Sequence, residues 1–113
     1  MSKQEIKEKV RQAIESNTYK KDIQKVSLFG SYLHGDAKET SDIDVLVEFT
    51  SDAHISLFDL VDMKRELEEA VKKPVDLLTP ESLSKFFRDS VINEAELIYE
   101  KWQKLFGAYS WSY

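Results

Sequence analysis

The stretch VSLFGSYLHGDAKETSDIDVLVEF, residues 26–49, decides the fold of this chain. It contains two apolar runs, 26–29 and 43–49, each with a length typical of a buried strand. Gly30 and Ser31 directly follow the first run, and the second run is opened by Asp42 and Asp44. The pattern therefore predicts two strands whose polar ends meet at one place.

Two carboxylates at this spacing are suited to binding a metal ion. Because successive side chains of a strand point to opposite faces, Asp42 and Asp44 are expected on one face, about 6.5 Å apart along the backbone. From there they can share a hard cation such as Mg²⁺. Gly30 allows close approach of a ligand to the backbone, and Ser31 offers a hydroxyl and an N–H. The alternative interpretation is an ordinary turn beside a solvated strand entrance.

The flanking sequence predicts helices that alternate with strands. Helices are expected over 2–15, over 56–71 and from Pro80 onward, with a short helix between Ser31 and Gly35; strands are expected over 24–29, 43–49, 75–78 and 96–99. The side chains expected on the apolar helix faces are Ile6, Val10, Ala13, Ile14, Leu57, Leu60, Val61, Leu67, Val71, Leu83, Phe86, Phe87 and Val91. This order predicts an α/β fold in which helices pack on a small mixed sheet.

Asp76 stands alone in the apolar run 75–78. A carboxylate in such a strand is costly to bury unless it has a partner or a cation. Asp76 is therefore expected to have a partner or a cation, and one interpretation is a strand-edge acid bonded to a neighbouring loop or lysine.

Length and composition narrow the function classes. With 113 residues the chain is expected to form one domain over 1–105, followed by an aromatic tail over 106–113. Its 21 acidic and 16 basic residues give a net charge of −5, which argues against a nucleic-acid backbone as ligand. There is no cysteine, no apolar signal region and no apolar run of membrane-spanning length, so a cytoplasmic protein without a membrane partner is expected.

The motif Phe29-Gly30-Ser31, then Gly35, then the run 41–47 (SDIDVLV) resembles the signature of the minimal nucleotidyltransferases, small members of the DNA polymerase β superfamily. The resemblance covers about residues 23–100 and implies a polymerase β-like fold. Members of this family transfer a nucleoside monophosphate from a nucleoside triphosphate to an acceptor hydroxyl, using two Mg²⁺ ions. Many are encoded beside a HEPN-domain toxin and act as its antitoxin, some by adenylylating a tyrosine of the toxin.

The resemblance also implies metal-binding and catalytic roles for the three acids. Asp42 and Asp44 match the ligands of both Mg²⁺ ions. Asp76 matches the third carboxylate, which holds the catalytic metal and helps to deprotonate the acceptor hydroxyl.

The nucleotide-binding part of the implied site lacks an arginine that is frequent in the family. Gly30 and Ser31 match the residues that hold the triphosphate of ATP, and Gly35 closes the short helix. Relatives often carry an arginine where this chain has His34, and sometimes where it has Tyr32. A neutral imidazole contributes less positive charge than a guanidinium, so nucleotide affinity is expected to be weaker unless a partner supplies the cation.

The sequence therefore predicts a Mg²⁺-dependent transferase of AMP from ATP to a HEPN-domain partner. The alternatives are a non-catalytic antitoxin that acts by occlusion, and a nucleotidyltransferase of small molecules of the antibiotic-modifying type. The tail Trp102–Tyr113 is rich in aromatic residues and is expected to cover a partner or a second copy in a homodimer, or else to fold onto its own sheet.

Overall fold

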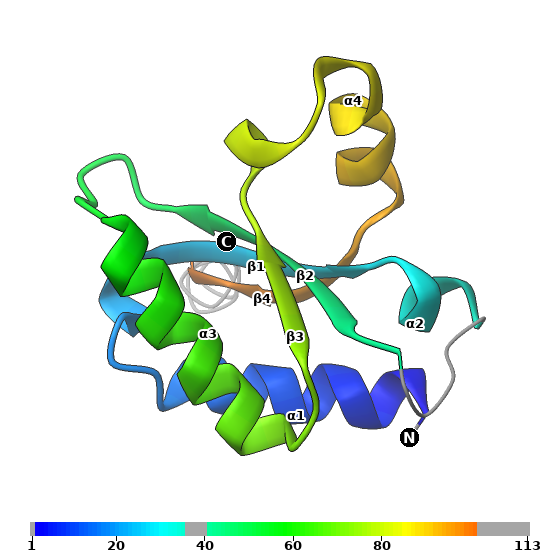
Figure 1. Ribbon diagram of the computed structural model, residues 1–113, viewed down its shortest axis with the longest axis horizontal. Coiled ribbons are helices and arrows are strands. Elements are labelled where there is room, and N and C mark those ends of the chain that lie inside the picture. Colours follow the sequence, from blue (N-terminus) through cyan, green and yellow to red (C-terminus); the bar gives the residue numbers. More distant parts are fainter. Residues whose placement is uncertain (1, 36–40, 102–113) are drawn as a thin grey trace, which may run out of the picture.

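The computed structural model describes residues 2–35 and 41–101, which form one mixed sheet with helices on it (Figure 1). The helices are α1 (Lys3–Glu15), η1 (Lys20–Asp22), α2 (Ser31–His34), α3 (Leu57–Val71), η2 (Pro80–Ser82) and α4 (Lys85–Glu94). The strands are β1 (Ile23–Phe29), β2 (Ile43–Phe49), β3 (Val75–Leu78) and β4 (Glu96–Glu100). The predicted α/β class and mixed sheet are confirmed.

The strand order is β3-β2-β1-β4. β1 pairs antiparallel with β2 and with β4, whereas β2 and β3 are parallel. Parallel neighbours need a crossover connection, and α3 provides it. β3 is therefore an edge strand of the sheet that the structure describes. A fully buried strand over 75–78 is not observed: only Val75 is buried, and Asp76 is exposed.

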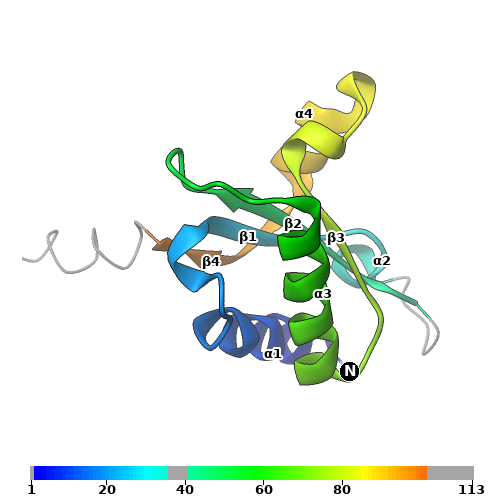
Figure 2. The same ribbon diagram turned by 60° about the vertical axis from the view of Figure 1, so that its left-hand side comes forward.

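One hydrophobic core lies between the sheet and the two long helices. Helices α1 and α3 contact each other and contribute to the same cluster as the core-facing residues of β1 and β2 (Figure 2). The four apolar residues predicted on one face of α1, namely Ile6, Val10, Ala13 and Ile14, are all buried. A capping box between Ser2 and Glu5 starts this helix. No helix in the described part of the chain is both long and apolar enough to span a bilayer.

The apolar stripe predicted for α3 is only partly correct. Met63, Leu67 and Val71 are buried, but Leu57 is 79% and Val61 is 62% exposed. Val61 and Leu67 are six residues apart, which places them about 120° apart around a helix of 3.6 residues per turn. The core contacts only the side that carries Leu67, so the other half of the predicted stripe faces water.

The single helix predicted from Pro80 is wrong. The 3₁₀ turn η2 ends at Ser82, where the Ser82 hydroxyl donates to the Thr79 carbonyl at 2.8 Å. Leu83 is then extended, and Ser84 caps the separate helix α4. Phe86 is 92% and Phe87 64% exposed, and α4 contains no buried residue, because it lies on the side of the sheet opposite to α1 (Figures 1 and 2).

The loop between α1 and β1 is bonded to the first half of α3. The Tyr19 hydroxyl lies 3.2 Å from Asp59 Oδ1 and 3.1 Å from Asp62 Oδ2. Loss of solvent, followed by the hydrogen bond to Asp62 and the two negative charges, raises the pKa of Tyr19 from 10.0 to about 12.

This shift predicts a loss of stability in alkali. Between pH 10.0 and about 12 the unfolded chain has lost the Tyr19 proton and the folded chain has kept it, so the free energy of unfolding falls as the pH rises through this window. Tyr19→Phe is expected to be less stable than the native chain near neutral pH and to lose less stability across the window. Urea denaturation at both ends of the window measures this difference. Equal losses in the two proteins would contradict it.

Candidate functional site

The strand register brings two of the predicted acids together. On β2, Asp44 is paired with Phe29 of β1 on one side and with Asp76 of β3 on the other. Parallel neighbours lie about 4.8 Å apart, so the side chains of Asp44 and Asp76 leave adjacent strands side by side. Ile43 and Val45 point into the core, so Asp44 is on the face of the sheet that α1 and α3 do not cover.

Asp42 lies two residues before Asp44 and just before β2 begins at Ile43. Strand alternation places it on the same face as Asp44, and its side chain is exposed. The Ile43 N–H donates to the Pro74 carbonyl at 2.9 Å, which joins the start of β2 to the segment that enters β3. Asp42 therefore lies at the end of the sheet where β2 and β3 begin, which is also where Asp44 and Asp76 lie.

Gly30 is in direct contact with the carboxylate of Asp44. A Cβ built on Gly30 would lie 2.0 Å from Asp44 Oδ2 and 2.8 Å from its Cγ, and the backbone of Gly30 has φ +78°. Both the space and the conformation therefore require glycine at this position. The sequence suggested that the Gly30 backbone approaches a bound ligand closely. In the structure it closely approaches Asp44, which is a predicted ligand of the metal ion.

The short helix α2 follows this contact. The Gly30 carbonyl accepts hydrogen bonds from the N–H groups of Leu33, at 3.1 Å, and His34, at 3.2 Å. Tyr32 is buried in the core, which holds α2 against the sheet, and Ser31 begins the helix directly after Gly30. Gly35 follows the helix with φ +79° and open space at its Cβ position.

His34 is paired with α4 and is well exposed. Its Nε2 lies 3.6 Å from Glu94 Oε2, and the two side chains are 53% and 60% exposed. Arg88, which is also on α4, donates from Nη2 to the Leu83 carbonyl at 3.2 Å, so it contacts the backbone just before this helix.

One contact near the site could not be found from the sequence. The Lys73 ammonium lies 5.8 Å from the centroid of the Tyr32 ring, although the two residues are 41 positions apart. The same holds for His34 and Glu94. Neither pair has a local spacing signal, because both depend on how α2 meets later segments of the chain.

The donor set fits magnesium in chemistry and in strand placement. Carboxylate oxygens are the ligands that Mg²⁺ prefers, and Asp42, Asp44 and Asp76 occupy one edge of the sheet. Within residues 2–35 and 41–101, no group of three or more His, Asp or Glu side chains is close enough together to hold a metal ion. The register thus aligns Asp44 with Asp76, while the three carboxylates do not converge as a preformed cage.

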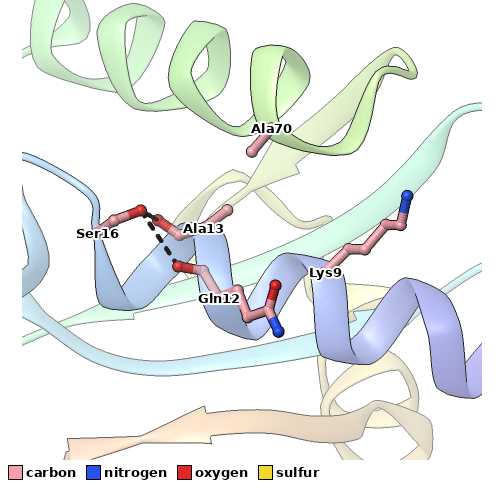
Figure 3. A pocket seen from close by; sticks show the side chains of 5 residues that line it. All are labelled: Lys9, Gln12, Ala13, Ser16 and Ala70. Carbon is pink, nitrogen blue, oxygen red and sulfur yellow. Dashed lines mark hydrogen bonds between the residues drawn. The ribbon is translucent and has the colours of Figure 1, made fainter.

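A hollow between α1 and α3 is separate from this site. Lys9, Gln12, Ala13, Ser16 and Ala70 line a cavity of about 370 Å³ between α1 and α3 (Figure 3). Ser16 Oγ donates within it to the carbonyls of Gln12, at 3.2 Å, and Ala13, at 3.4 Å. The sheet separates this hollow from the face that carries the acids.

Comparison with known proteins gives a consistent result. The family model described as polymerase beta, nucleotidyltransferase matches residues 8–104. A Methanocaldococcus jannaschii protein, whose name proposes protein adenylyltransferase activity, is 49% identical over 73 residues, which are 65% of this chain and 76% of that protein.

Two solved structures have the same fold. A toxin–antitoxin structure with AMP-PNP superimposes with a TM-score of 0.69 at 24% identity and covers 94% of this chain and 84% of that chain. A complex of the tri-AMPylated Shewanella oneidensis HEPN toxin with its MNT antitoxin gives a TM-score of 0.63 at 22% identity and covers 97% and 84%. The family model spans most of the residues, and the chain belongs to the polymerase β nucleotidyltransferase family, as its Gly30-Ser31 and Asp42/Asp44 motif indicated.

Proposed function

We propose that this chain transfers AMP from Mg²⁺-bound ATP to a hydroxyl of a HEPN-domain protein and so acts as the antitoxin of a toxin–antitoxin pair. The observation that carries the proposal is the register that pairs Asp44 with Asp76 while Asp44 contacts Gly30. This arrangement joins a carboxylate pair to the turn that leads into α2. It is the combination that transfer of a metal-bound phosphoryl group requires.

In the proposed reaction, the acceptor oxygen attacks the α-phosphorus of ATP, the bond to the β-phosphate oxygen breaks, and pyrophosphate leaves. Asp42, Asp44 and Asp76 would hold Mg²⁺, which supplies charge neutralisation for the phosphates and lowers the pKa of the acceptor hydroxyl. Asp76 is exposed at the edge strand, where it can accept the hydroxyl proton from an incoming protein. Gly30, Ser31 and Gly35 would border the triphosphate, with His34 at the end of the short helix.

The relatives support adenylyl transfer and a toxin partner. The Methanocaldococcus jannaschii relative is named for transfer to proteins, one structural neighbour contains AMP-PNP, and another is an antitoxin with its AMPylated HEPN toxin. A protein acceptor agrees with these relatives better than a small-molecule acceptor does.

A non-catalytic antitoxin is the second candidate. One observation favours it: His34, which the family resemblance matches to a frequent arginine, lies 3.6 Å from the acid Glu94. In that case the chain would inhibit its partner by occlusion alone.

The deciding experiment is incubation of the chain with labelled ATP, Mg²⁺ and the product of the adjacent gene. We expect transfer of one or more AMP groups to a tyrosine of the partner, detected by mass spectrometry and abolished by EDTA. A tight complex without any label, at full occupancy of ATP, would favour occlusion.

Binding of Mg²⁺ and ATP should also stabilise the fold. A ligand present at 100 times its Kd adds about 2.7 kcal/mol to the free energy of unfolding, which corresponds to roughly 10 °C in Tm for a domain of this size. The Tm is expected to rise with Mg²⁺ and ATP together and to change little in Asp44→Asn. A similar rise in both proteins would place the nucleotide elsewhere.

A further inference from the structure

An apolar patch covers the first two turns of α3. It consists of Leu57, Phe58 and Val61, which are 79%, 84% and 62% exposed. At 3.6 residues per turn these side chains share one side of the helix. Large apolar side chains gathered on one surface mark a place that another segment or molecule covers. We call these three residues the α3 patch.

The last described residue contacts the same loop that is bonded to α3. Lys101 Nζ donates to the Lys21 carbonyl at 2.9 Å. Two residues earlier in the same loop, the Tyr19 hydroxyl is bonded to Asp59 and Asp62. These acids directly follow Phe58 and Val61 in the sequence. The described chain therefore ends at a residue that is bonded to this loop, and the loop in turn contacts the first turns of α3.

The composition of residues 102–113 matches the α3 patch. Five of these 12 residues are aromatic, namely Trp102, Phe106, Tyr109, Trp111 and Tyr113. Their one charged side chain is Lys104, which complements the acids beside the patch. Twelve residues span at most about 40 Å when extended and about 18 Å as a helix. Either length is sufficient for a segment that starts at this loop.

We propose that residues 102–113 fold back onto the α3 patch of the same molecule. A covalently attached segment competes at an effective concentration in the millimolar range, so it outcompetes a second copy of the chain in dilute solution. Phe86 and Phe87 are also exposed, but they are less accessible to residues 102–113. They lie on α4, which precedes the start of β4, whereas the tail leaves the far end of that strand, about 14 Å away along the strand.

The two tryptophans of the chain allow a direct test, because both are in the tail. In a Trp102→Phe background, the fluorescence of Trp111 reports the tail alone. Phe58→Ser is expected to shift its emission to longer wavelength and to increase its quenching by acrylamide. Phe86→Ser is the matched control, because Phe86 is 92% exposed and lies on α4, and it should change neither quantity. The measurements use the chain without any partner, with circular dichroism to verify folding.

Each outcome supports or overturns the proposal. A response to Phe58→Ser alone, identical across a hundredfold dilution, supports it. A response that disappears on dilution shows that a second copy covers the patch, and equal responses or none in the two variants overturn the proposal. Should Phe58→Ser fail to fold, Leu57→Ser serves in its place. Deletion of 102–113 should in addition increase binding of an apolar dye, and Phe58→Ser in that background should reverse the increase.

Discussion

Asp44→Asn is expected to lower the rate of AMP transfer by about a thousandfold. Metal-ion stabilisation of the transition-state charge is worth several kcal/mol, and each 1.36 kcal/mol is a factor of ten in rate. Asn retains the size of Asp44 but provides a weaker, neutral ligand, and the adjacent Asp76 cannot replace it. Measurement of labelled AMP on the proposed HEPN-domain partner under single-turnover conditions gives the rate of the chemical step.

Glu48→Gln is the matched control for this prediction. Glu48 is on β2, as Asp44 is, and strand alternation places it on the same face four residues further along. Glu48→Gln removes the same charge outside the proposed metal site. The transfer rate should therefore stay within about twofold, as is usual for surface substitutions. Equal losses in the two variants would indicate a general electrostatic effect of the acidic face and would contradict a specific role of Asp44.

Gly30→Ala is expected to have the second largest effect, on both stability and activity. The new Cβ would lie 2.0 Å from Asp44 Oδ2, so the carboxylate must move, and the backbone has φ +78°. Displacement of a catalytic group by about 1 Å can cost roughly a hundredfold in rate. Backbone strain together with the collision should lower the free energy of unfolding by about 3 kcal/mol or more. Urea denaturation and the transfer assay measure the two effects.

Gly35→Ala separates the collision from the backbone strain. Gly35 has nearly the same φ, +79°, but nothing lies within 4 Å of its Cβ position. Only the cost of a left-handed conformation should remain, about 1–2 kcal/mol. In addition, Asp44→Ala should restore part of the stability of Gly30→Ala without restoring activity. If Gly30→Ala and Gly35→Ala were equally destabilised, the contact between Gly30 and Asp44 would not be the cause.

The local part of the fold was predictable because its signals are short. Alternation of Ile43, Asp44 and Val45 placed the acid and its two neighbours on opposite faces of β2, as observed. The polar residue Ser2 and the acid Glu5 form the capping box that starts α1. A strand over 96–99 was also predicted and corresponds to β4, although its position beside β1 was not predicted.

The failed predictions concern which side of a helix is covered. Leu57, Val61, Phe86 and Phe87 have helical spacing, and the sequence assigned them to the core, yet all four are exposed. Periodicity shows that a helix has an apolar side, but it does not show how wide that side is or what lies against it. On α3 the core takes only the side of Met63 and Leu67, and α4 contributes no buried residue at all.

By itself the sequence determined the family, the class of the fold and the strand ends at which Gly30, Asp42 and Asp44 lie, because these depend on spacings of a few residues. Only the tertiary structure decided that Asp76 stands beside Asp44 on an edge strand, that Gly30 contacts the Asp44 carboxylate and that His34 faces Glu94. These contacts join segments 14 to 60 positions apart. Their geometry depends on the order and register of the strands, which result from packing the whole core at once.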